Sequence, residues 1–117
     1  MELKENRREK RFLYEMPGTV HVELRMSKEP GVSKIFDLPV NDCSRNGLGM
    51  VITKKDFDLL PLISEGDRLR DMAFFATWSV FKVNGIVTHK TKIEEGPYKS
   101  CYIMGIKSED MIGKCQP

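Results

Sequence analysis

Two short segments of this chain carry charged and polar side chains whose types and spacing could bind a ligand. The first is Arg7-Arg8-Glu9-Lys10-Arg11, an Arg-x-x-x-Arg pattern, and the second is Asp42-Cys43-Ser44-Arg45-Asn46-Gly47, an Asp-x-Ser-x-x-Gly pattern. Each has an ordinary explanation when taken alone: a solvated basic arm for the first, and an Asx or Ser turn before a glycine for the second. The functional hypothesis therefore depends on the two segments acting together.

The residue types in the two segments match the groups of a guanine nucleotide. An arginine presents a planar fork that fits phosphate oxygens and the O6/N7 edge of guanine, and it also stacks on bases. The Asp42 carboxylate accepts hydrogen bonds, and guanine offers N1–H and an amino group that adenine does not offer in that arrangement. The Ser44 hydroxyl donates to a phosphate or base. Gly47 is expected to allow a positive φ and a close approach of backbone to the ligand.

The order of the motifs, about thirty residues apart, resembles the PilZ domain family. Members of that family bind cyclic di-GMP (c-di-GMP) with an Arg-x-x-x-Arg stretch before the first strand and an Asp/Asn-x-Ser-x-x-Gly turn between the second and third. The resemblance extends from Arg7 to Met111. It includes four later segments: Gly47-Leu48-Gly49-Met50, Gly66-Asp67, Phe81-Lys82-Val83-Asn84-Gly85-Ile86-Val87 and Tyr102-Ile103-Met104-Gly105-Ile106.

The resemblance implies a role for each residue of the two motifs. Arg7 and Arg11 would contact the guanine bases and phosphates, Asp42 a guanine edge, and Ser44 a phosphate or base, while Gly47 would shape the turn. Arg8 and Arg45 have no assigned family role and are close enough to add charge as accessories. Asn6 stands where an arginine tends to accompany a stacked ligand dimer, which favours one ligand per chain.

The resemblance also implies a function. The chain would be a bacterial second-messenger receptor that binds c-di-GMP without catalysis, needs no cofactor or metal, changes conformation and engages an unidentified protein partner. Two alternatives stay open: a PilZ-like interaction domain that does not bind the ligand, and a small barrel that binds single-stranded nucleic acid through its arm and exposed aromatics. An enzyme is disfavoured because the sequence offers no acid–base pair, nucleophile or metal set.

Alternating apolar residues predict the framework that positions these motifs. Val20, Val22 and Leu24 share one face of a strand, and similar patterns recur near 35–40, 48–52, 69–75, 81–88 and 102–106. Six strands with turn signals between them indicate an all-β fold, a six-stranded antiparallel barrel with at most short helical turns. Residues 1–12 are expected to be a mobile, arginine-rich arm, and residues 13–117 a single PilZ-like β-barrel domain.

The local turn rule and the family resemblance give different predictions for the backbone at Asn84-Gly85. Asn-Gly between two β-rich runs is a strong hairpin signal, whereas the family pattern has one long strand through a glycine. We follow the family and predict a continuous strand. In the segment 54–66, the apolar residues around Pro61 predict only one short helical turn.

Composition narrows the class of protein further. The chain has 117 residues, 40% of them hydrophobic and 31% charged, and a net charge of +2, which is too small to imply bulk DNA binding. The polar N-terminus and the lack of a long apolar run predict a cytoplasmic protein that does not insert into a membrane. Cys43, Cys101 and Cys115 are expected to be reduced thiols. His21 and His89 are expected to be solvated or structural, and Trp78, Phe74, Phe75 and Phe81 to belong to the core or barrel rim.

Overall fold

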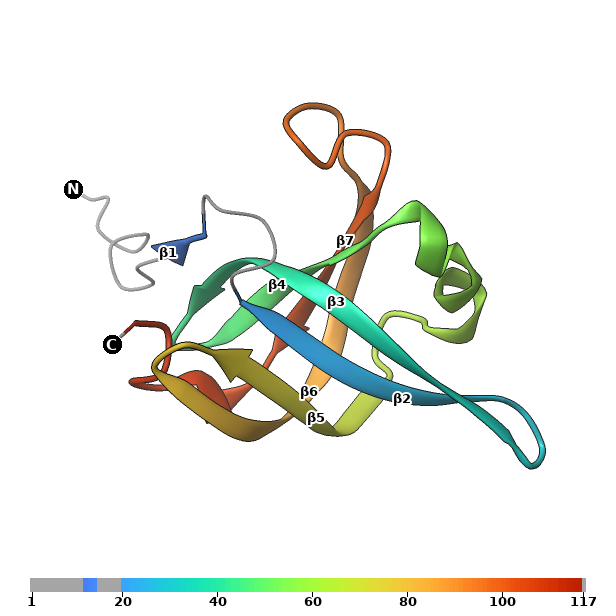
Figure 1. Cartoon of the computed structure of the whole chain (residues 1–117), viewed down its shortest axis with the longest axis horizontal. Helices are drawn as coiled ribbons and strands as arrows, with labels where there is room; N and C mark the ends of the chain where they lie inside the picture. Colours follow the sequence, from blue (N-terminus) through green and yellow to red (C-terminus); the bar gives the residue numbers. More distant parts are fainter. Residues whose placement is uncertain (1–11, 15–19, 117) are drawn as a thin grey trace.

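The computed structural model describes residues 12–14 and 20–116. Within these residues the chain forms seven β-strands and two short 3-10 helices (Figure 1). The strands are β1 (Phe12–Leu13), β2 (His21–Glu29), β3 (Val32–Ser44), β4 (Gly47–Ile52), β5 (Arg68–Ala76), β6 (Ser79–Lys92) and β7 (Tyr102–Lys107), and the helices are η1 (Lys54–Leu62) and η2 (Glu109–Met111). Neither of these helices is long and apolar enough to cross a membrane.

The strands β2 to β7 close into an antiparallel barrel. They are hydrogen-bonded in the order β3-β2-β5-β6-β7-β4, and β4 pairs again with β3 to complete the ring. This confirms the predicted six-stranded antiparallel barrel for the part of the chain that the structure describes. The sequence did not predict β1, whose two residues pair with the last part of β3. Phe12, the last residue of the predicted arm, is the first residue of this strand.

The barrel interior is filled by the apolar residues whose alternation predicted the strands. On β2, Val22 and Leu24 are at most 1% exposed, and they lie opposite the fully buried Leu38 and Phe36 of β3. Burying one such side chain stabilises the fold by about 1.5–3 kcal/mol. Buried side chains of β2 to β7 form a single hydrophobic cluster. The division into an arm at residues 1–12 and a single domain at residues 13–117 stays a prediction.

Three of the four aromatic residues expected in the core or at the barrel rim, Phe74, Phe81 and Trp78, lie in the core or pack against it. Phe74 is fully buried and stacks on Phe81 with 4.7 Å between ring centroids. Trp78 is half-buried and packs against the core cluster. Phe75 is also half-buried, and it stacks on the ring of His21. These rings therefore contribute to packing more than to an exposed base-stacking platform.

Strand β6 runs without a break through Asn84-Gly85, which confirms the continuous strand and overrules the local hairpin rule. A bulge in the partner strand β5, between Leu69 and Met72, accommodates this segment. The polar groups of Asn84 are satisfied there, because its side chain accepts from the Asp71 N–H at 2.8 Å and its own N–H donates to Asp110 at 2.8 Å. Tertiary hydrogen bonds thus replace those that a two-residue turn would make.

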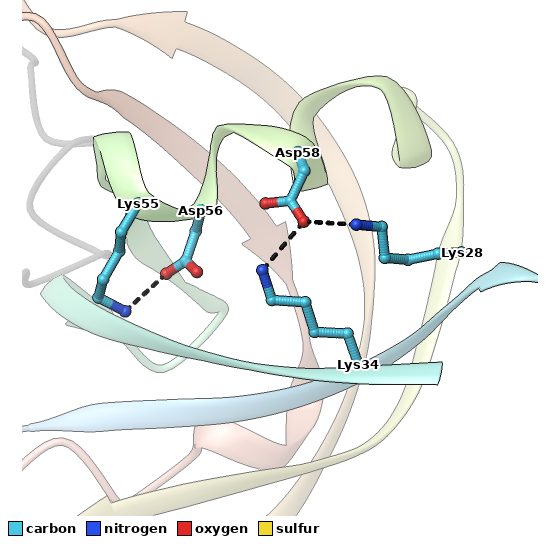
Figure 2. A network of polar contacts seen from close by, with 5 residues as sticks. All are labelled: Lys28, Lys34, Lys55, Asp56 and Asp58. Carbon is cyan, nitrogen blue, oxygen red and sulfur yellow. Dashed lines mark hydrogen bonds and ion pairs between the residues drawn. The ribbon is translucent and has the colours of Figure 1, made fainter. Parts of the chain in front are cut away.

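Helix η1 is held against the β2–β3 hairpin by exposed ion pairs (Figure 2). Asp58 of η1 accepts from Lys28 at 3.0 Å and from Lys34 at 2.9 Å, while Lys55 pairs with Asp56 of the same helix. The hydrogen bond from Lys34, and next that from Lys28, lower the pKa of Asp58 to about 2. Such pairs contribute little to stability in solvent. They link the β2–β3 hairpin to η1.

The structure corrects the expectation that all three cysteines are reduced. Cys43 of β3 and Cys115 form a disulfide with 5.8 Å between their Cα atoms, and Cys101 is a buried free cysteine. A separation of 72 residues hides the pair in the sequence. The segment after η2 folds back to the end of the barrel that carries Cys43, where Trp78 Nε1 donates to the Lys114 carbonyl at 3.0 Å. This return brings the two thiols together.

Candidate functional site

The arginines of the first motif lie outside the described residues, and their role stays a prediction. The segment that follows them is described from Phe12 onward. Phe12 and Leu13 pair with Cys43 and Asp42 of β3, and the Tyr14 N–H donates to the Asn41 carbonyl at 3.1 Å. Strand β1 begins one residue after Arg11 in the sequence, so the chain that leaves the first motif is attached to the strand that carries the second.

The second motif forms the hairpin between β3 and β4. Asp42, Cys43 and Ser44 end β3, Arg45 and Asn46 make a two-residue turn, and Gly47 opens β4 opposite Ser44. The Asn46 carbonyl accepts from the Ser108 N–H at 2.8 Å, which joins the turn to the chain after β7. Arg45 is exposed, and its role as an accessory residue stays a prediction.

Ser44 is fully buried beneath this turn. Its Oγ accepts from the Asn46 N–H at 3.3 Å, which is the local bond that favours serine in turns. In this structure the hydroxyl therefore shapes the hairpin. Direct contact between Ser44 and a ligand stays a prediction.

Gly47 is required for a different reason from the one that the sequence suggested. Its φ is not in the left-handed region, which corrects the expected positive φ. A Cβ built on Gly47 would instead overlap the carbonyl oxygen of Ile106 on the neighbouring strand β7. The glycine allows β4 and β7 to approach each other where the turn begins.

Gly47→Ala is expected to destabilise the barrel by about 2–3 kcal/mol, because the obstructing atom is backbone and cannot rotate away. Gly31→Ala is the control: Gly31 has a φ of 79° and nothing within 4 Å of an added Cβ, so only backbone strain of about 1 kcal/mol is expected. Urea unfolding of both variants measures the difference. A Gly47→Ala variant no less stable than Gly31→Ala would contradict this account.

Asp42 is half-buried on the outer face of the barrel. Its Oδ2 accepts from Asn41 Nδ2 at 3.0 Å. Burial, and next the charge of the Asp42 carboxylate, raise the pKa of Tyr14 to about 12. The neutral phenol of Tyr14 donates to the Cys115 carbonyl at 2.6 Å. The carboxylate, β1 and the disulfide-linked tail thus meet at one end of the barrel.

A depression of about 350 Å³ lies beside Asp42 on this outer face. Its lining includes two glycines of paired strands, Gly49 of β4 and Gly105 of β7, and polar residues of β3 and β6, namely Asp42, Thr88 and His89. Gly105 and His89 were not among the site residues that the sequence predicted. The sequence did carry a signal for this site, because Gly49 and Gly105 each lie inside a predicted strand. A glycine within a strand often marks a place where a ligand or another backbone approaches closely.

The described residues contain no cluster of three or more histidine, cysteine, aspartate or glutamate side chains that could hold a metal ion. The polar groups at the depression are a carboxylate, an imidazole and a hydroxyl, together with the backbone of two glycines. This set suits hydrogen bonding to an organic ligand.

Known structures share this fold. No protein-family profile matches the sequence, and no curated protein matches it. Among solved structures, the chain is similar to the MrkH–c-di-GMP complex of K. pneumonia, with a TM-score of 0.67 and 16% identity over 86% of this chain and 43% of that one. It is also similar to the PilZ domain with c-di-GMP of YcgR from Escherichia coli, with a TM-score of 0.61 and 13% identity over 92% of this chain and 81% of that one.

These comparisons define the class of fold. At 13–16% identity the likeness concerns the fold alone, and the fold of this chain is that of a PilZ domain. The fold implied by the resemblance in the sequence is thereby confirmed. The chain spans less than half the length of MrkH.

Proposed function

We propose that this chain is a non-catalytic receptor for c-di-GMP. The observation that carries the proposal is the pairing of β1 with β3, since it joins the segment that follows Arg11 to the strand that carries Asp42. Two motifs far apart in the sequence then serve one site. The solved c-di-GMP complexes with this fold support the choice of ligand.

Each motif residue has a chemical role in this proposal. Arg7 and Arg11 bind the guanine bases and phosphates, because guanidinium forks match phosphate oxygens and the O6/N7 edge of guanine. The Asp42 carboxylate accepts from guanine N1–H and the amino group. Gly47 lets the turn approach β7, Ser44 holds the turn or binds the ligand, and Arg8 and Arg45 add positive charge.

Signalling follows from ordering of the arm in this proposal. c-di-GMP bridges residues 1–12 and the barrel, and the bridged arm exposes or covers a surface for a protein partner. The ligand shifts the equilibrium only through its different affinity for the two states.

A thermal denaturation series tests the proposal. A ligand that binds only the folded chain stabilises it by about 2.7 kcal/mol at one hundred times its Kd. For a domain of this size that raises Tm by roughly 10 °C. We expect this rise with c-di-GMP and less than about 2 °C with cyclic di-AMP or GMP at the same concentration. No rise at several hundred micromolar c-di-GMP would contradict the proposed function, and a rise with single-stranded DNA would favour the nucleic-acid alternative.

A further inference from the structure

Four residues form one transverse row across the outer face of four neighbouring strands. Asp42 of β3 lies opposite Gly49 of β4, Gly49 opposite Gly105 of β7, and Gly105 opposite His89 of β6. Their neighbours along β4 and β7, namely Leu48, Met50, Met104 and Ile106, are buried in the core. Because side chains alternate along a strand, the row faces outward.

Two β-bulges lie on either side of the glycine pair Gly49 and Gly105, and each places a polar side chain over one of these glycines. The register of β3 against β4 shifts between Val40 and Asp42, and the Asp42 Oδ2 lies 2.8 Å from the position of a Cβ on Gly49. The register of β6 against β7 shifts between Val87 and His89, and the His89 ring overlaps the position of a Cβ on Gly105. Bulges commonly re-aim side chains in this way.

The His89 ring has one nitrogen engaged locally and one directed over Gly105. Its Nδ1 lies 2.9 Å from Thr91 Oγ1, and its Nε2 and Cδ2 are the atoms nearest the Cβ position of Gly105. When the Thr91 hydroxyl donates to Nδ1, the ring hydrogen lies on Nε2, beside the depression. The depression of about 350 Å³ falls in the usual range of small-molecule sites, about 300–1,000 Å³.

We propose that His89 is a ligand-binding residue of this site and that, with Asp42, it selects guanine over adenine. Its Nε2–H donates to O6 of a guanine whose N1–H and amino group face the Asp42 carboxylate. Guanine presents an acceptor at O6 and donors at N1–H and the amino group, whereas adenine places an amino donor where guanine has O6. The inference rests on the proposed function, because it assigns a further contact to the same ligand.

Isothermal titration of four proteins with two ligands tests the proposal. The proteins are wild type, His89→Phe, His89→Gln and His21→Phe. The ligands are c-di-GMP and its analogue with 6-thioguanine bases, in which sulfur, a weak hydrogen-bond acceptor, replaces O6. Phenylalanine keeps a ring but loses the donor, and glutamine keeps an N–H near the Nε2 position. His21 bonds to Asp37 and stacks on Phe75, neither of which lines the depression, so it is the matched control.

We expect His89→Phe to weaken c-di-GMP binding about tenfold, and His89→Gln and His21→Phe to stay within about threefold of wild type. The 6-thio analogue should bind wild type about tenfold more weakly than c-di-GMP does, and should bind His89→Phe as well as c-di-GMP does. The role of His89 would be overturned, but not the proposed function, if His89→Phe bound c-di-GMP like wild type. The same conclusion would follow if the analogue lost equal affinity for wild type and for His89→Phe. Absence of c-di-GMP binding by wild type would instead overturn the proposed function, and this inference with it.

Discussion

Replacing Asp42 with alanine is expected to weaken c-di-GMP binding about 100-fold while leaving the barrel folded. The carboxylate would otherwise accept two charge-assisted hydrogen bonds from guanine, and losing them leaves buried donors unpaired at a cost of about 2–3 kcal/mol. Each 1.4 kcal/mol corresponds to about tenfold in affinity. Asp42 lies over Gly49 on the outer face and outside the hydrophobic core, so truncation leaves the core intact.

Isothermal titration calorimetry measures this loss, and a thermal melt of each protein checks the fold. Asp37→Ala is the matched control, because Asp37 is an exposed aspartate of the same strand and bonds to His21 at 2.6 Å. It should bind like wild type. Arg11→Ala should weaken binding by a similar factor to Asp42→Ala, since it removes the guanidinium from the other motif. If Asp42→Ala and Arg11→Ala both bind like wild type, the site is assigned wrongly.

Reducing the Cys43–Cys115 disulfide is expected to destabilise the chain by about 3–4 kcal/mol. The bond closes a loop of about 72 residues, and releasing it restores conformational entropy to the unfolded chain. For a domain of this size, Tm should fall by roughly 10–15 °C. The expected loss of stability is large because the disulfide links β3 covalently to the segment after η2. The other contacts of that segment include the hydrogen bonds from Trp78 and Tyr14.

Urea unfolding with and without a dithiol reductant measures this contribution. A Cys115→Ser variant should unfold like reduced wild type under both conditions. A Cys101→Ala variant should keep the response to reductant, because Cys101 is not part of the bond. Equal unfolding midpoints for oxidised and reduced wild type would show that the bond contributes nothing to stability.

The barrel could be predicted from the sequence because its strands have one buried face each. A strand with one buried face alternates apolar and polar residues, as Val20, Val22 and Leu24 show. This alternation located six strands in the sequence. The long strand β6 needed the family resemblance, since the Asn84-Gly85 dipeptide has a strong local preference for a turn. The hydrogen bonds that keep it extended come from Asp71 and Asp110, which lie far from it in the sequence.

The candidate site could be predicted only in part, because its pieces depend on register. The Asp-x-Ser-x-x-Gly hairpin is local, so the sequence located it correctly. The pairing of β1 with β3, the Cys43–Cys115 bond and the row from Asp42 to His89 depend on which strands become neighbours and on two bulges. A two-residue strand has no periodicity, and a histidine among exposed strand residues resembles any solvated one.

A titration of isotopically labelled protein with c-di-GMP, followed by amide NMR shifts, tests whether the two motifs form one ligand site. It reports binding and its location in one measurement. We expect saturable shifts at residues 7–11, at the hairpin from Asp42 to Gly49, and at His89 and Gly105. We expect little change at the β2–β3 hairpin tip or η1, which are held together by the Lys28 and Lys34 pairs with Asp58. No shifts at ligand excess, or shifts confined to that distant region, would contradict the proposal that the two motifs form one site.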